Sequence, residues 1–211
     1  MLCMILATDM DYGIGKNNTL PWHCSADLMV FKALTKDQVI AMGHNTWKSL
    51  PKKPLPDRDH IVLSRNPELK LDYPRVEHLK SVYHLLDVDP ELNVWVIGGA
   101  DIFEAIGQQC TYIHHTLIPE NYYCDTHYRY DEVDIKLISQ VQYQTSDYAV
   151  PLQFSLYYNE ALSRNRDRSF EFDVAIKREN ALLAHSRKVK QERSDQPSYP
   201  SADSIASLSQ T

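Results

Sequence analysis

The sequence predicts an α/β domain built on a mainly parallel sheet, with an antiparallel pair of strands at one edge. Short apolar runs alternate with helical patterns over residues 1–118, which is typical of parallel strands joined by crossover helices. Two later strand-like segments, 135–145 and 170–176, follow without a helix between them, which favours antiparallel pairing. The length of 211 residues, 43% of them hydrophobic and 24% charged, suits one soluble domain with additional residues beyond it.

The first elements are read from apolar runs and their spacing. Residues 1–7 are an apolar run and the first expected strand, and the aperiodic loop 8–24 follows. A loop of that length inside a compact domain is usually functional. Ser25 can cap a helix over 26–35, where apolar residues recur at helical spacing, and residues 39–42 are the second strand.

The rest of the first half continues the alternation. Each expected strand is a short apolar run, and glycine or proline separates several of the elements. In order, we expect a short helix at 44–50, a proline-rich connection at 51–56, a strand at 61–63, a helix at 79–86, a strand at 94–97, a helix from the glycine pair to 106 and a strand at 111–118.

The second half contains no glycine and has a different pattern. Apolar and polar residues alternate over 170–176, which predicts a strand, and 146–168 is expected to be an insertion or long loop. Serine and proline replace apolar periodicity toward the C-terminus. We therefore expect a catalytic domain over 1–178 and a largely disordered extension over 179–211.

Charge and cysteine content exclude several classes of protein. The net charge is −6, which is not typical of a nucleic-acid-binding protein. No signal peptide or membrane-length apolar run is found, and the four cysteines have no C-x-x-C spacing. We expect free thiols, no metal site and a cytoplasmic protein. The basic stretch 177–193 is expected to be a solvated tail or a contact with an anionic surface.

Two features could carry chemistry. Gly43 and the pair Gly98–Gly99 each join a strand to a helix, so backbone N–H groups there could bind phosphates, although ordinary turns have the same pattern. Neither turn is a common dinucleotide or P-loop fingerprint. Asp27 lies on the first expected helix, and it is either exposed on the polar face or held in a pocket, where desolvation would raise its pKa.

An ordered series of motifs runs through the first 130 residues. They are Ile-Gly-x-x-Asn-x-Leu-Pro-Trp at 14–22, Ala-Asp-Leu-x-x-Phe-Lys at 26–32, Met-Gly-x-x-Thr-Trp at 42–47, Pro-Leu-Pro-x-Arg at 54–58, Leu-Ser-Arg at 63–65, Val-Ile-Gly-Gly at 96–99 and Asp-Thr-His at 125–127. The series resembles dihydrofolate reductase, and more loosely so as far as residue 178.

The resemblance implies a fold and an activity. It implies one α/β domain with a central eight-stranded, mostly parallel sheet, an antiparallel C-terminal edge strand and about four flanking helices. It implies an NADPH-dependent oxidoreductase that transfers hydride to C6 of dihydrofolate and favours protonation at N5, giving tetrahydrofolate. Methotrexate or trimethoprim would be inhibitors. A monomer is expected, with a possible protein partner at the C-terminal extension.

The resemblance also assigns site residues by position. The catalytic positions are Asp27, with Trp22 and Leu20 of the preceding loop, which corresponds to a mobile lid. The substrate positions are Ile5, Ala7, Asp27, Leu28, Phe31, Lys32, Leu50, Leu55, Arg58, Ile97, Phe103 and His114. The cofactor positions are Ala7, Ile14, Gly15, Asn18, Leu20, Gly43, His44, Asn45, Thr46, Leu63, Ser64, Arg65, Ile97, Gly98, Gly99, Ala100, Asp101, Ile102 and Phe103.

Some of these assignments have named roles. Arg58 matches the arginine that binds the substrate's glutamate carboxylate, and His44, Ser64 and Arg65 match contacts of the adenosine 2′-phosphate. Gly98–Gly99 matches a pair joined by a cis peptide. These roles are implied by the resemblance and not by spacing.

Several positions depart from the family pattern. Asp57 and Cys124 stand where glycine is usual, and Phe103 stands where tyrosine is frequent. The threonine that normally partners the catalytic carboxylate is replaced by His114, or the register slips and brings in Thr116. Two other functions stay open: a non-catalytic folate- or NADPH-binding protein, and a reductase of another heterocycle such as a pyrimidine.

Overall fold

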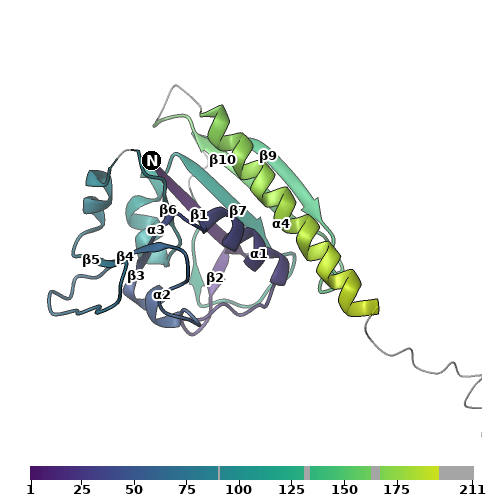
Figure 1. Cartoon of the computed structure of the whole chain (residues 1–211), viewed down its shortest axis with the longest axis horizontal. Helices are drawn as coiled ribbons and strands as arrows, with labels where there is room; N and C mark the ends of the chain where they lie inside the picture. Colours follow the sequence, from purple (N-terminus) through teal and green to yellow (C-terminus); the bar gives the residue numbers. More distant parts are fainter. Residues whose placement is uncertain (90, 131–133, 163–166, 195–211) are drawn as a thin grey trace, which may run out of the picture.

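An eight-stranded sheet organises the chain in this computed structural model, which describes residues 1–89, 91–130, 134–162 and 167–194 (Figure 1). Its strand order is β5-β4-β3-β6-β1-β7-β10-β9, and a small second sheet pairs β2 with β8. The strands are β1 (Leu2–Thr8), β2 (Gly13–Gly15), β3 (Val39–Gly43), β4 (Asp59–Leu63), β5 (Val76–Leu79), β6 (Val94–Val96), β7 (Tyr112–Leu117), β8 (Thr126–His127), β9 (Ile135–Tyr143) and β10 (Leu152–Asn159).

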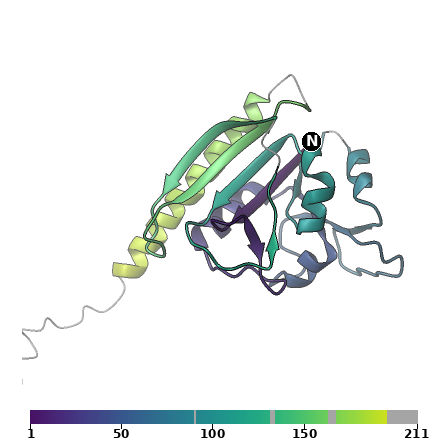
Figure 2. The same ribbon diagram turned by 180° about the vertical axis from the view of Figure 1, so that it is seen from behind.

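Helices cover both faces of the sheet (Figures 1 and 2). One face packs against α1 and α4, and the other packs against α3 and the 3₁₀ helix η1. The helices are α1 (Ser25–Thr35), α2 (His44–Ser49), η1 (Val82–Asp87), α3 (Ala100–Ile106), η2 (Gly107–Gln109) and α4 (Arg168–Ser194). Because both faces are covered, the central strands are buried along most of their length, which explains their nearly continuous apolar sequences.

The predicted architecture is confirmed. The strands β5, β4, β3, β6, β1 and β7 run parallel, and β10 pairs antiparallel with both β7 and β9 at the C-terminal edge. The first half differs in two details. The segment 79–86 is not one helix, because Leu79 ends β5 and η1 follows it. Ser25 is not the cap of α1, since the cap position is Cys24 and makes no side-chain hydrogen bond.

The prediction for the second half is wrong in two places. Residues 170–176 are not a strand but the start of α4, and the expected loop 146–168 contains the strand β10. The buried residues of α4 follow a helical spacing, from Phe170 and Val174 to Arg178 and His185, four or seven positions apart. Phe172 and Ile176, which created the apparent alternation, are 68% and 41% exposed.

Helix α4 lies along the last two strands and against α1 (Figure 2). The Ser25 hydroxyl on α1 is 2.8 Å from Nε2 of His185, and the other ring nitrogen of His185 is 3.0 Å from the Tyr143 hydroxyl on β9. The expected boundary at residue 178 therefore falls inside a helix that is packed into the domain, and residues 195–211 of the expected extension lie outside the described residues.

Candidate active site

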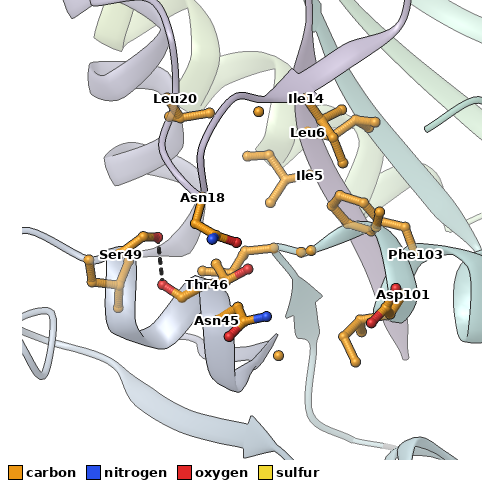
Figure 3. Close-up of a pocket in the computed structure, with 18 of the residues that line it drawn as sticks. Ile5, Leu6, Ile14, Asn18, Leu20, Asn45, Thr46, Ser49, Asp101 and Phe103 are labelled. Carbon is orange, nitrogen blue, oxygen red and sulfur yellow. Dashed lines mark hydrogen bonds between the residues drawn. The ribbon is translucent and has the colours of Figure 1, made fainter. Parts of the chain in front are cut away.

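A cleft of about 1650 Å³ opens where the carboxyl ends of the central strands meet the loop 9–24. Side chains from β1 (Ile5, Leu6), the loop (Asn18, Leu20), α2 (Asn45, Thr46) and α3 (Asp101, Phe103) face the same space (Figure 3). In open α/β sheets, ligands bind at this edge of the sheet because the loops that follow the strands converge there.

Among the described residues that line the cleft, Asp27 is the carboxylate of α1, in the first turn of that helix. Its side chain is partly buried, and desolvation raises its pKa from 3.8 to about 6, while a hydrogen bond with Thr116 of β7 opposes that rise. A carboxyl with a pKa near neutrality can hold or release a proton in the physiological range. The alternative of an exposed Asp27 on a solvated helix face is excluded.

The partner of Asp27 is Thr116 and not His114. The two residues lie on the same face of β7, two positions apart, so His114 is displaced along the strand and does not line the cleft. It is buried under α4, next to Phe154. His114, which was expected to contact the substrate, does not line the cleft, and Thr116 is the residue of β7 that bonds to Asp27.

The loop 9–24 is held at its base by the buried side chain of Asp9. Its Oδ1 accepts hydrogen bonds from the backbone N–H of Asp11 and of Gly13, at 2.9 and 2.7 Å. Its Oδ2 accepts one from the N–H of Tyr122 at 3.1 Å and one from Sγ of Cys124 at 3.4 Å. Burial opposes ionisation, but these bonds together keep the pKa of Asp9 below its ordinary value. The charged carboxylate thus ties the start of the loop to the segment around Tyr122 and Cys124.

Trp22 and Leu20, at the end of this loop, both line the cleft. Trp22 is buried and packs against Tyr122, with ring centroids 5.4 Å apart, and its Nε1 has no hydrogen-bond partner within the described ranges. This N–H is buried and unpaired within those ranges, and it belongs to a side chain that lines the cleft. Leu20 is exposed, as expected of an apolar residue on a lid.

The two glycine turns lie side by side at the cleft. A cis peptide joins Gly98 and Gly99, as the resemblance implied, and Gly98 has a φ of 122°, which favours glycine. The backbone N–H of Gly43 donates to the carbonyl of Gly98 at 2.7 Å, so the turns are linked directly. Gly43 and Gly99 are the N-caps of α2 and α3, and no side chain of the described residues makes a capping hydrogen bond to either helix. A Cβ at Gly99 would lie 3.3 Å from the Thr46 hydroxyl, a tight contact that would require Thr46 to shift by a few tenths of an ångström.

Cationic side chains line both ends of the cleft. Arg65 and Lys80 are exposed at the end near β4 and β5, close to His44, whose pKa is lowered by burial and by Lys48. At the other end, Arg58 is buried: its Nε donates to the Thr35 hydroxyl at 2.9 Å, and one terminal nitrogen donates to the carbonyl of Pro56 at 2.6 Å. A ligand that carries anionic groups at both ends would match this distribution.

All the site residues expected from the sequence line the cleft except His114. The remaining lining residues were not assigned from the sequence, although Pro56 and Thr126 stand within the quoted motifs. They are Leu6, Thr19, His23, Cys24, Ser49, Pro51, Pro56, Lys80, Ser81, Val82, Tyr83, Glu104, Ala105 and Thr126. Lys80 could have been found, because it directly follows β5, whose parallel neighbour β4 leads to Arg65.

Comparison with known proteins settles the family. The family model of dihydrofolate reductase matches residues 1–159. The chain belongs to the dihydrofolate reductase family. A dihydrofolate reductase from Bacillus subtilis (strain 168) is 32% identical over 173 residues, which cover 81% of this chain and 100% of that protein. A putative dihydrofolate reductase from Caenorhabditis elegans is 34% identical over 156 residues, covering 66% and 82%.

A solved structure and a longer relative agree with this family assignment. Dihydrofolate reductase from Enterococcus faecalis, complexed with NADP(H) and RAB-propyl, superposes with a TM-score of 0.68 at 28% identity, covering 75% of this chain and 95% of the other. A bifunctional dihydrofolate reductase-thymidylate synthase from Paramecium tetraurelia is 33% identical over 129 residues, 59% of this chain but 27% of that protein. The chain thus spans about a quarter of that bifunctional relative, and α4 lies beyond the segment that the family model matches.

Proposed function

We propose that this protein is an NADPH-dependent dihydrofolate reductase. The observation that carries the proposal is the position of Asp27, a carboxyl with a pKa near 6 in a cleft that also contains two linked glycine turns. The reaction takes up one proton and one hydride: dihydrofolate, NADPH and H⁺ give tetrahydrofolate and NADP⁺. The cleft provides separate regions for the ring that is reduced, for a nucleotide and for an anionic tail.

In this proposal Asp27 orients the pterin and manages the proton. Its carboxylate accepts hydrogen bonds from the pterin 2-amino group and ring N–H, and its negative charge favours protonation at N5, since a buried anion stabilises a developing cation. The bond with Thr116 directs the carboxylate. Leu28 and Phe31 on the same helix supply apolar contacts, and Arg58 and Lys32 attract the carboxylates of the glutamate tail.

The residues at the glycine turns fit a dinucleotide. The uncapped N-termini of α2 and α3, with Thr46 between them, suit a diphosphate, and Ser64, Arg65 and Lys80 suit a 2′-phosphate. Gly98–Gly99 lets the nicotinamide approach the sheet edge beside Ile97 and Phe103. When bound, NADPH supplies the hydride from C4 of its ring to C6 of the pterin. The loop 9–24 excludes water from that space.

The setting of the enzyme is part of the proposal. Cys3, Cys24, Cys110 and Cys124 are all free thiols, which is typical of a reducing compartment such as the cytoplasm. No described helix is long and apolar enough to cross a membrane. We propose a monomer as the active form, as the family resemblance implies.

A steady-state assay tests the function. Oxidation of NADPH is followed at 340 nm with dihydrofolate, with a pterin lacking the glutamate tail and with a diaminopyrimidine-type nucleotide precursor as a competing heterocycle. The proposal expects turnover with dihydrofolate, a marked loss in Asp27→Asn and retention in Asp72→Asn, an exposed carboxylate outside the cleft. Absence of turnover in a folded wild-type protein would contradict it, and faster turnover with the pyrimidine would reassign the substrate.

A further inference from the structure

Helix α4 contacts α1 at the end of α1 that carries Asp27. Ser25 is the first residue of α1, and Asp27 lies in the first turn of the same helix. The Ser25 hydroxyl is 2.8 Å from Nε2 of His185, a residue of α4 that is 4% exposed. The N-cap residue of α1, Cys24, makes no capping hydrogen bond with its side chain. The side chain of Ser25 therefore ties this end of the helix to α4.

Both ring nitrogens of His185 have partners. Nδ1 is 3.0 Å from the hydroxyl of Tyr143 on β9, and that hydroxyl donates to the carbonyl of Leu182 at 3.2 Å. Because the Tyr143 hydrogen is used in this way, its oxygen accepts from Nδ1–H, and Nε2 accepts from the Ser25 hydroxyl. Three side chains from α1, α4 and β9 thus form one hydrogen-bonded row, in which loss of the middle member leaves both others without their partner.

The row and the catalytic carboxyl lie on opposite sides of α1. Successive residues of an α-helix are turned by about 100°, so the side chains of Ser25 and Asp27, two positions apart, point in nearly opposite directions. Asp27 bonds with Thr116 of β7. The first turn of α1 is therefore held by one hydrogen bond on each side, to α4 through Ser25 and to β7 through Asp27. A shift of this turn at one bond changes the geometry of the other.

The start of α4 has an attachment of its own. The ring of Phe170 lies 4.8 Å from the ring of Tyr112 and 6.0 Å from that of Trp95, measured between centroids. The backbone N–H of Asp167, directly before the helix, donates to the Tyr112 hydroxyl at 2.9 Å. These contacts hold α4 on the sheet without involving α1. A change at His185 therefore loosens the contact with the first turn of α1 while the start of α4 stays attached.

We propose that His185 is a positioning residue for the catalytic carboxyl and acts through Ser25. The inference rests on the proposed function, in which Asp27 manages the proton. Without the His185 ring, the first turn of α1 shifts relative to β7 and the bond between Asp27 and Thr116 weakens. The glycine turns for the cofactor precede α2 and α3 and keep their geometry. Because α4 lies beyond residues 1–159, which the family model matches, this support comes from the added part of the chain.

The test measures the pKa of Asp27 in the absence of substrate. Aspartate carboxyl groups are isotope-labelled and titrated by magnetic resonance between pH 4 and 8, and the Asp27 signal is the one lost in Asp27→Asn. In His185→Ala we expect the pKa of Asp27 to rise by about 0.5–1 pH unit, part of the about one to two units that a hydrogen bond to a carboxylate contributes. The neighbouring thiol of Cys24, with a pKa of about 11, stays uncharged over this range.

Two further variants show whether the effect passes through the hydrogen bonds. His185→Gln should restore most of the wild-type value, because its amide can accept from Ser25 and donate to Tyr143. Ser25→Ala removes the link from the α1 side and should raise the pKa of Asp27 as His185→Ala does. Ser25 is partly exposed and alanine favours helices, so this variant decides the question if His185→Ala does not fold.

Val174→Ala is the matched control, since Val174 is a buried residue of the same helix outside the row. It should lower the free energy of unfolding and leave the pKa of Asp27 unchanged. Adding His185→Ala to Thr116→Val should cause little further rise in that pKa, because the bond through which His185 acts is already absent. In turnover, the midpoint of the pH–rate profile should rise in His185→Ala, while KM for NADPH should not change.

Three results would overturn the proposal: a pKa of Asp27 that does not rise in His185→Ala or Ser25→Ala, an equal rise in Val174→Ala, or a fully additive rise in the double variant with Thr116→Val. The titration uses neither dihydrofolate nor NADPH. Absence of turnover would therefore contradict the proposed function, while the titration alone decides whether His185 positions the carboxyl.

Discussion

Asp27 should limit the stability of the folded protein as well as carry its chemistry. Its pKa rises from 3.8 to about 6 on folding, so the native state binds this proton more tightly than the unfolded state does. The resulting stabilisation is complete below about pH 4 and is lost as the pH rises through 6. A rise of about two pH units, at about 1.36 kcal/mol each, makes the ionised carboxylate cost about 3 kcal/mol at pH 8.

Asp27→Asn removes this cost, because the amide has similar shape and no charge. We expect the apo variant to be up to about 3 kcal/mol more stable than wild type at pH 8, which corresponds to about 6–12 °C in Tm for a domain of this size. At pH 4 the two proteins should be equally stable. Water in the cleft screens the charge and reduces the gain in stability, so we expect the variant to be at least about 1 kcal/mol more stable at pH 8.

Urea unfolding curves at a series of pH values between 4 and 8 measure the difference directly. Asp72→Asn, at an exposed site, controls for the loss of a surface carboxylate. A gain in Asp27→Asn that does not change with pH would refute the linkage between burial and protonation. A variant less stable than wild type at pH 8 would refute the claim that the carboxylate is held in an unfavourable environment.

Three further outcomes are expected. Thr116→Val removes the bond that opposes the rise in the Asp27 pKa, so the midpoint of the pH–rate profile should move to higher pH; an unchanged midpoint contradicts the pairing. Arg65→Ala should raise KM for NADPH about 10–150-fold with little change for NADH, since a charged hydrogen bond to phosphate contributes about 1.5–3 kcal/mol; equal effects on both cofactors would place Arg65 elsewhere. His185→Ala leaves the hydroxyls of Ser25 and Tyr143 without their partner and should lower the free energy of unfolding by about 1–3 kcal/mol. Arg187→Ala, at an exposed position, should leave it almost unchanged.

The fold of the first 130 residues was largely predictable, because local apolar runs mark its strands and recognisable motifs mark its turns. Short apolar runs become parallel strands when both sheet faces are covered, and glycine turns keep their place because Gly98 needs its positive φ. The choice between His114 and Thr116 was not predictable. Both residue types fit the same face of β7, and the choice depends on how far along that strand Asp27 lies.

The predicted strand at 170–176 was wrong for a physical reason. Phe170, Phe172, Val174 and Ile176 satisfy a two-residue period over seven positions, but a helical set of buried residues continues to His185. A short window cannot separate the two periods when apolar residues also occur on the outer face of a helix. Only the tertiary contact of α4 with α1 and the last strands decides between them.

That outer face has a practical consequence for handling the protein. Phe172, Ile176 and Leu183 lie on one side of α4, at positions 172, 176 and 183, and all three are exposed. Three apolar side chains in a row on a long surface helix favour association of copies at the concentrations used for crystallisation or magnetic resonance. Glutamine or glutamate at these positions would improve colloidal behaviour without removing a core contact, and the cleft would be untouched, since none of the three residues lines it.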